Sequence, residues 1–541
     1  MKKIHKNIIF SIAIFEFLFS IALPITIVNL LILFNRYMFV SADSITRSID
    51  ILVLPVIIGL ILGILLANLS IKRKSKSLGR FIQISAIFGL AFSPLFLPFL
   101  LQYLSYKFDF LPATGYRKAS IADPPTITNF RIIDSILSGQ FNIAIDYLYH
   151  LILPWIVMTC AITALITLIS RSYQLNKSEN RSIVPISLYF GIIFGVISGF
   201  SLLVESIFYF NGAFQGIIRI MNFYGKNSAF PIIFPLCFTI LSIVTNMGFI
   251  LFGYIKNRKA NISRMKNSDI FQSTENETTL ENSGYKKEIS DNNNAQPTIN
   301  LNELKKYFLK KLRSPFTLFG LLIIIFAIFI SIFPMIFTPY SKEEYFLGIV
   351  FNPPSASHPL GTTDFGRDIL ALIIYGTSDS LLFAFFTVLI ALSGGLILGI
   401  PMSLINKDFN LSSEILMIFM YIFPMIIILI LFEVNFIIFG ILMIPLFTQI
   451  IAHTNFNILN IVKKVIIYLP LIFGFIILLY NTLGFLGFLR DPNAIVFGNI
   501  ISIGVGRIVD APWATFYPCL ALFILVMGFF LVYGGLQKVY N

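Results

Sequence analysis

Charged residues are scarce in this chain of 541 residues, because only 12% are Asp, Glu, Lys or Arg and 57% are hydrophobic. A soluble domain usually has about 25% charged residues, so this composition excludes an ordinary soluble enzyme. The chain has 58 Phe and a mean hydropathy of +0.86. Its apolar residues form uninterrupted runs, not the one-sided stripe of a surface helix. These runs indicate that lipid surrounds most of the chain.

Metal-binding and catalytic patterns are also missing. The three cysteines, Cys160, Cys237 and Cys519, lie inside apolar runs without paired spacing, and the four histidines have no ligand spacing. No phosphate-binding Gly-x-x-x-x-Gly-Lys-Ser/Thr motif occurs. We therefore expect no enzyme activity, no bound metal and no cofactor. Any ATP hydrolysis is expected on separate subunits.

Twelve apolar segments are long enough to cross a membrane as helices, since a span needs roughly 20 apolar residues. Strands of a membrane barrel would be about 10 residues long with alternating polarity, so we expect an all-α polytopic membrane protein. In the first half, the expected spans are residues 8–34, 50–70, 83–105, 147–170, 184–210 and 228–255. In the second half, they are residues 315–338, 377–405, 413–432, 434–452, 465–488 and 515–536.

The positions of Lys and Arg predict that both termini lie in the cytoplasm, because this orientation puts most of them on the inner side. The clearest cluster follows the second span and contains Lys72, Arg73, Lys74, Lys76 and Arg80. We favour its role as an anchor on anionic membrane lipid, with docking of a partner protein as the alternative. The net charge of +13 therefore requires no nucleic acid.

The chain is expected to consist of two six-helix halves, residues 1–256 and 315–541, joined by a polar cytoplasmic linker at residues 257–314. Residues 261–300 have too little apolar surface to offset chain entropy, so most of the linker should be disordered. From Leu301 to Leu312, apolar residues recur at helical spacing among lysines. This pattern predicts a short helix on the inner membrane face.

The most informative motif is the outer loop FNPPSASHPLGTTDFGRDILALIIYGTSDSLLFA, residues 351–384. It closely resembles the signature of the second permease subunit of ABC importers for oligopeptides, dipeptides and nickel, and such a long spaced match is specific. We favour a structural cap as the role of this loop, with direct cargo contact as the alternative. The matching residues are Pro353, Pro354, Leu360, Gly361, Thr362, Asp364, Gly366, Arg367, Asp368, Tyr375 and Gly376.

Further segments extend the resemblance through both halves. In the second half, NTLGFLGF at 481–488, FGN at 497–499 and APW at 511–513 are similar in order and spacing to elements of that subunit. In the first half, residues 62–70, 110–115 and 198–218 resemble the partner permease subunit. The candidate pathway or outer-gate residues in this half are Glu205, Phe208, Gly212 and Asn246. Glu205 either lines a polar passage or caps backbone near Gly212.

The resemblance implies a fused permease with the fold of a type I ABC importer. Such a protein moves peptides or similar solutes across the plasma membrane by alternating access. Its partners are ABC ATPase subunits inside and a solute-binding protein outside.

The cytoplasmic coupling loops depart from this family, because both expected intervals, residues 170–183 and 453–470, lack the Glu-Ala-Ala core and look shortened. A non-transporting membrane scaffold or sensor is therefore the alternative function. The candidate coupling residues in these intervals are Arg171, Lys177, Arg181, Lys463 and Lys464.

Overall fold

The computed structural model describes ten stretches of the chain. They are residues 42–71, 76–118, 120–178, 200–212, 215–216, 301–405, 434–452, 454, 458–489 and 495–536. The predicted spans at 8–34, 228–255 and 413–432, most of the span at 184–210 and linker residues 257–300 lie outside them. Within the described residues, regular structure is helical, and the single β-bridge joins Thr362 to Asp368.

The first half is built around two long parallel helices. Gly59 and Gly63 of α2 face Ile162 and Ile166 of α6, and a Cβ at either glycine would lie 2.6 Å from the isoleucine side chain. The missing side chains let the two helix backbones approach closely, a common device in membrane helix pairs. The helices are α2 (Ala42–Ile71), α3 (Lys76–Phe92), α4 (Phe96–Phe108), α5 (Arg131–Leu137) and α6 (Phe141–Ser178).

The predicted single span at 83–105 is broken into α3 and α4, which are bent by 70°. Pro94 lies at the break. A proline in a helix interior removes one hydrogen bond and clashes with the preceding turn, which accounts for the correction. The helical stretch at 200–207 also ends before the predicted residue 210, in a turn where Tyr209 has a φ of 51°.

Among the described residues of the second half, four apolar helices are long enough to cross a membrane, and the helix at Phe436–Ala452 is apolar but shorter. Gly394, Gly395 and Gly399 of α13 pack against α16, while Gly320 of α11 packs against Gly528 of α19. The predicted helix at Leu301–Leu312 is confirmed. The elements are α10 (Leu301–Leu312), α11 (Pro315–Ile332), α12 (Pro334–Phe337), η2 (Leu347–Ile349), α13 (Ile369–Ile405), α16 (Phe436–Ala452), α17 (Ile458–Phe485), α18 (Phe497–Val505) and α19 (Trp513–Leu536).

Six described helices are long and apolar enough to cross a membrane, or seven if the bent pair is one span. The predicted class, an all-α polytopic membrane protein, is therefore confirmed. The boundaries shift by several residues, since α13 begins at Ile369 instead of 377 and α6 continues to Ser178. The helix expected at 315–338 is interrupted at Phe333, just before Pro334.

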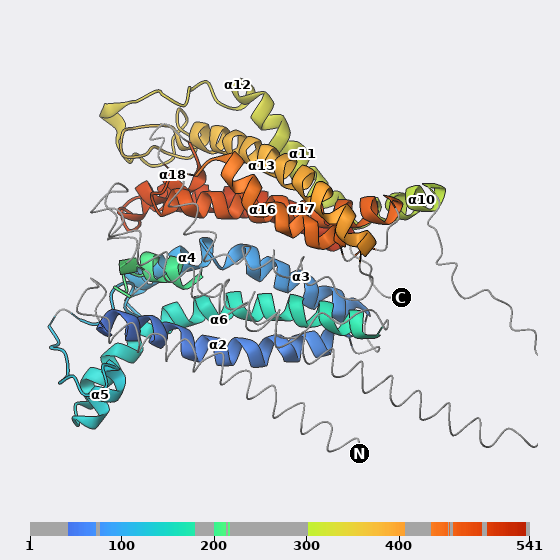
Figure 1. Cartoon of the computed structure of the whole chain (residues 1–541). Coiled ribbons are helices and arrows are strands. Elements are labelled where there is room, and N and C mark those ends of the chain that lie inside the picture. Colours follow the sequence, from blue (N-terminus) through green and yellow to red (C-terminus); the bar gives the residue numbers. More distant parts are fainter. Residues whose placement is uncertain are drawn as a thin grey trace, which may run out of the picture.

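The two halves meet along an aromatic seam, which we define as the contact of α3 and α4 with α17 and α19. In Figure 1 the helices of residues 42–178 and those of residues 301–536 form two neighbouring layers, with α3 and α4 nearest the second. The Phe523 ring lies 5.1 Å from that of Phe88 and 5.5 Å from that of Phe92. Phe99 and Phe485 are 5.6 Å apart. Such edge-to-face contacts contribute about 0.5–1.5 kcal/mol each beyond their burial.

Candidate functional site

Residues 338–368 form an ordered cap at one end of the bundle, near α12 and α18 in Figure 1. In the predicted orientation this is the outer end, and we call these residues the outer cap. Gly361 and Gly366 have φ values of 80° and 70°, in the left-handed region that favours glycine. A Cβ at Gly361 would lie 2.7 Å from Trp513, and one at Gly366 would overlap the carbonyl oxygen of Phe346. The glycines of the signature are therefore required by the path of the backbone.

Asp368 joins the outer cap to α13. One carboxylate oxygen accepts a hydrogen bond from the Ala371 N–H at 2.8 Å, and the other lies 3.1 Å from Nδ1 of His358. Both side chains are buried, and the His358 ring stacks on Tyr340 with centroids 4.9 Å apart. A carboxylate that accepts an early helical N–H stabilises the start of the helix. This cap explains why α13 begins at Ile369.

The other signature residues of the loop lie nearer the surface. Pro353 and Pro354 are exposed, and Asp364 lies 3.8 Å from Arg367 in a partly exposed ion pair. The Arg367 guanidinium lies 5.6 Å from the centre of the Tyr345 ring. Leu360 packs at the edge of the core, and Thr362 accepts a hydrogen bond from the Asn352 N–H at 2.9 Å. The exposed prolines and the partly exposed ion pair are thus the signature residues accessible to a ligand or partner.

Motifs that lie more than 100 residues apart in sequence converge beside the outer cap. Asn481 of α17 donates to Ser380 of α13 at 3.1 Å and accepts a hydrogen bond from the Gly498 N–H at 3.4 Å. A Cβ at Gly498 would overlap the Asn481 carbonyl oxygen. Gly376 of α13 approaches the backbone of Ile495 in the same region.

A small apolar cluster continues this contact. Tyr375 packs there against Leu372, Ile495 and Ile500. The structure therefore brings the resemblance-bearing segments 360–376, 481–488, 497–499 and 511–513 into one unit at the outer end.

Glu205 of the first half lies fully buried against the chain that follows it. Its carboxylate accepts hydrogen bonds from the Ser48 hydroxyl at 2.5 Å and the Gln215 N–H at 3.0 Å. A Cβ at Gly212 would overlap this carboxylate. Through these contacts, the Glu205 carboxylate stabilises the turn after residue 207 and connects this turn to α2.

Phe208, another outer-gate candidate of the first half, is buried as well. Its carbonyl oxygen accepts a hydrogen bond from the Gly115 N–H at 2.8 Å. Asn246 lies outside the described residues.

Sequence reasoning missed a charge network at the outer end of the first half, made of Asp43, Arg47, Asp123, Arg131 and Tyr147. Arg131 of α5 donates to Asp43 of α2 at 2.6 Å and to the Tyr147 hydroxyl of α6 at 2.8 Å. It also forms an ion pair with Asp123, while Arg47 pairs with Asp43. The i,i+4 pair Asp43 and Arg47 was the local signal available in the sequence, but its partners are far apart along the chain.

Neighbouring groups favour the ionised form of two carboxyl groups in this region, Asp43 and Asp134. Burial opposes ionisation of Asp43, but the hydrogen bond from Arg131 and the charges of Arg47 and Arg131 lower its pKa below the ordinary value. For Asp134 of α5, burial is likewise outweighed by hydrogen bonds from Thr128 and the Ile127 N–H, which lower the pKa. The charge network therefore fastens α5 and the loop before it to the ends of α2 and α6.

The candidate coupling residues do not lie together on an open loop. Arg171 lies inside α6, where its side chain is 9% exposed and donates to Gln83 of α3 at 2.5 Å. Lys177 also belongs to α6, because that helix continues two turns beyond the predicted end. The inner interval predicted at 170–183 is thus helical as far as Ser178. Arg181 lies outside the described residues.

The second interval is corrected in the same way. The loop predicted at 453–470 is helical from Ile458, which places Lys463 and Lys464 in the first turns of α17, where both are partly buried. Apolar residues continue through this stretch, and Pro470 is accommodated inside the helix. A proline is tolerated in a membrane helix when neighbouring groups satisfy the freed carbonyl.

The apolar helices define a multi-pass helical membrane protein. The sequence of its outer cap resembles the signature loop of transporter permeases. No model of a known protein family matches the sequence. The chain is 28% identical to the dipeptide transport system permease protein DppC of Alkalihalophilus pseudofirmus over 251 residues, which cover 40% of this chain and 83% of that protein.

Two further relatives match a shorter stretch. The di/tripeptide transport system permease protein DppC of Pseudomonas aeruginosa is 33% identical over 103 residues, and the dipeptide transport system permease protein DppC of Escherichia coli K12 is 30% identical over 101. Each match covers 18% of this chain and 34% of the relative. These relatives confirm the resemblance predicted from the signature, and the chain has the role of a membrane permease. They give no support to the scaffold alternative.

Proposed function

We propose that this one chain supplies both transmembrane halves of an ABC transporter that moves peptides or similar small solutes across the plasma membrane. Separate ATPase subunits power the transport, and a solute-binding protein delivers the cargo from outside. Both termini face the cytoplasm. The chain itself binds no ATP and performs no catalysis.

The aromatic seam is the main observation that supports two permease halves in one chain. The match to a permease relative covers 40% of the chain, so more than half of the chain lies beyond it. The helices of the first half pack along α3 and α4 against α19 of the second half. Two permease subunits that work as a pair need such a contact, and here the linker makes them one chain. The signature residues 353–376 serve as a cap for the second half in this arrangement.

The candidate coupling surface in this proposal is the inner end of the bundle. Lys463 and Lys464 in the first turns of α17 replace the missing Glu-Ala-Ala loops as basic contacts for ATPase subunits, together with Lys177 in the last turn of α6 and Arg181 beyond that helix. Coupling needs a contact that biases one conformation over another, and positive side chains at helix ends meet that need when the ATPase surface is acidic.

The direct test is uptake of a labelled dipeptide by cells that carry or lack the gene. We expect deletion to abolish uptake that depends on ATP, and the full chain to restore it. The control is Arg507→Gln, a substitution at an exposed position, and it should restore uptake fully. Unchanged uptake after deletion, with the chain present in normal amounts beforehand, would contradict the transport function.

A further inference from the structure

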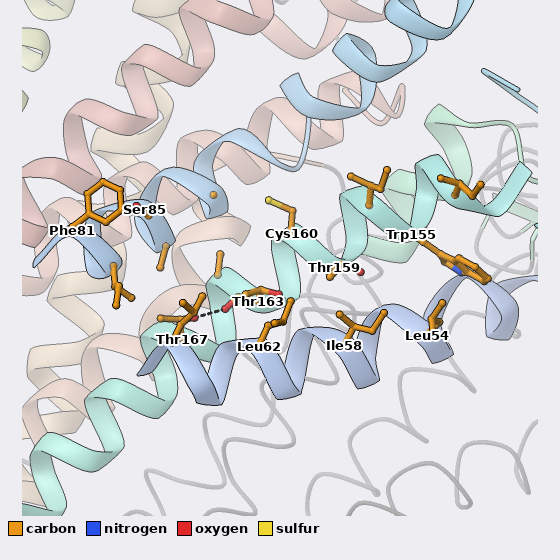
Figure 2. Close-up of a pocket in the computed structure, with 17 residues that line it drawn as sticks. Leu54, Ile58, Leu62, Phe81, Ser85, Trp155, Thr159, Cys160, Thr163 and Thr167 are labelled. Atoms are coloured by element: carbon orange, nitrogen blue, oxygen red, sulfur yellow. Dashed lines mark hydrogen bonds between the residues drawn. The ribbon is translucent and has the colours of Figure 1, made fainter. Parts of the chain in front are cut away.

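An apolar cavity of 590 Å³ lies between α2, α3 and α6. Figure 2 shows Leu54, Ile58 and Leu62 of α2 along one wall, with Phe81 of α3 and Trp155 of α6 at the other sides. The cavity follows α2 from Leu54 to Leu66, a length of about 18 Å at about 1.5 Å per residue. One leaflet of a bilayer has a hydrocarbon depth of about 15 Å, half of the full core. The cavity therefore has the length and the polarity of a site for one acyl chain.

Four hydroxyl side chains line the cavity, those of Ser85, Thr159, Thr163 and Thr167, and the Thr163 hydroxyl has no hydrogen-bond partner among the described residues. Figure 2 marks the hydrogen bond from the Thr167 hydroxyl to the Thr163 carbonyl oxygen, which is 2.7 Å long. A Ser or Thr hydroxyl that donates to the preceding turn is satisfied inside its own helix. Among the described lining residues, none is charged. A hydrocarbon occupant fits these walls better than a peptide.

A buried cation lies one helical turn beyond the cavity. Cys160, Ala164, Thr167 and Arg171 follow one another at spacings of four, three and four residues, so they share one face of α6. Arg171 is only 9% exposed, and its guanidinium donates a hydrogen bond to Gln83 of α3. Within the described part of the chain, Nε of Arg171 has no hydrogen-bond partner and no carboxylate pairs with the guanidinium.

The position of Arg171 makes this arrangement unusual. The apolar stretch of α6 that is long enough to span the membrane ends at this residue. A charge held at the membrane boundary without a counter-ion is costly and usually marks a functional site. A guanidinium with free donors prefers a phosphate or carboxylate group. Arg80, exposed on α3 one turn before Gln83, adds a second positive charge at the same end of the bundle.

We propose that α2, α3 and α6 bind one anionic phospholipid, with an acyl chain in the cavity and the phosphate on Arg171. The lipid comes from the leaflet that faces the α2–α3 turn, where Gly79 lies close against the Ser70 carbonyl group. The phosphate supplies the counter-charge that no described residue gives to Arg171, and the acyl chain covers the exposed apolar wall of α2. This site does not depend on the nature of the transported cargo.

Native mass spectrometry of the full-length chain, released from nanodiscs that contain phosphatidylglycerol, tests the site. We expect one retained phosphatidylglycerol per chain. Arg171→Gln should lower the retained fraction at least about tenfold, because it removes the charge-assisted hydrogen bonds to the phosphate. Arg171→Lys should keep more lipid than Arg171→Gln. Ser85→Phe should fill the cavity from the exposed face of α3 and lower retention by a similar factor.

Two control variants isolate the site from general effects. Arg507→Gln removes an exposed arginine at the end of the bundle opposite Arg171. Ser393→Phe adds an aromatic ring at an exposed position of α13. Both should retain lipid as the unmodified chain does. Retention by Arg171→Gln and by Ser85→Phe as high as that of the unmodified chain would overturn the proposal. Displacement of the lipid by glycerol 3-phosphate would overturn it too, because it would show a phosphate site that does not use the cavity.

Discussion

The two halves are stabilised by different interactions at the ends that we predict to face outward. In the second half, the outer cap depends on backbone geometry, since Gly361 and Gly366 adopt positive φ values and Asp368 caps α13. In the first half, closure depends on the charge network around Arg131, which gathers side chains from α2, α5 and α6. Backbone turns leave a motif in the sequence, whereas a network of distant charges leaves almost none. Different changes should therefore disrupt the outer cap and the charge network.

The largest expected effect is a Gly366→Val substitution in the outer cap. The side chain would overlap the Phe346 carbonyl oxygen and force a strained φ, so we expect a loss of at least about 3 kcal/mol in the free energy of unfolding. Thermal unfolding in detergent measures the loss. Gly487→Ala is the matched control, because Gly487 has a φ of 79° but nothing within 4 Å of its Cβ position. That variant should lose only about 1 kcal/mol, and equal losses would contradict the steric argument.

Arg131→Met should produce the next largest effect. It leaves Asp43 and Asp123 without their shared cation, and because both carboxylates are partly exposed we expect a loss of about 2 kcal/mol. Thermal unfolding should show it, and added salt should reduce the difference from the unmodified chain. Arg131→Lys keeps the charge but cannot donate to Asp43 through two nitrogens, so it should recover only part of the stability. No change in either variant would show that the charge network does not hold α5.

Asp368→Ala should have a smaller effect, about 1 kcal/mol from the lost helix cap, with a further loss from the broken contact to His358. The expected result is faster proteolysis within residues 341–358, because the loop loses its tie to α13. Asp368→Asn is the control, since Asn is also a good N-cap, and it should protect the loop better than Ala. Identical cleavage rates for Asp368→Ala and the unmodified chain would contradict the role of Asp368 in holding the loop against α13.

The smallest expected effect is the response to acid. The pKa values of Asp43 and Asp134 are lowered in the folded protein, so their stabilisation is present above the ordinary carboxyl pKa of about 3.9 and is lost as the pH falls through their folded values. The unfolding temperature of the unmodified chain should therefore decline below about pH 4. Asp134→Asn should show a weaker decline over the same range. A decline of equal size in that variant would show that Asp134 contributes nothing to it.

Much of the fold followed from local patterns in the sequence. The amphipathic spacing of Leu301–Leu312 predicted α10 with its observed bounds, and long apolar runs located the described spans. Helix ends were less predictable, because they depend on single interactions such as the Asp368 cap or the break at Pro94. The signature glycines contributed to the resemblance to known permeases, yet their contacts with Trp513 and Phe346 join segments that no local pattern connects.

The burial of charged residues could not be predicted from the sequence. Arg171 looked like a loop residue because a run of polar residues follows it, but α6 continues and places its side chain against α3. Arg131 gave no signal either, since Asp43 lies 88 residues away along the chain. Charges that pair across the fold become visible only when the helices are placed.

The subunit composition of the purified transporter tests the central claim most directly. Native mass spectrometry of the complex, isolated through a tag on this chain, counts each subunit. The account predicts one copy of this chain with two ATPase subunits and no other permease. A complex that contains a second permease subunit, or two copies of this chain, would contradict the claim that one chain supplies both halves.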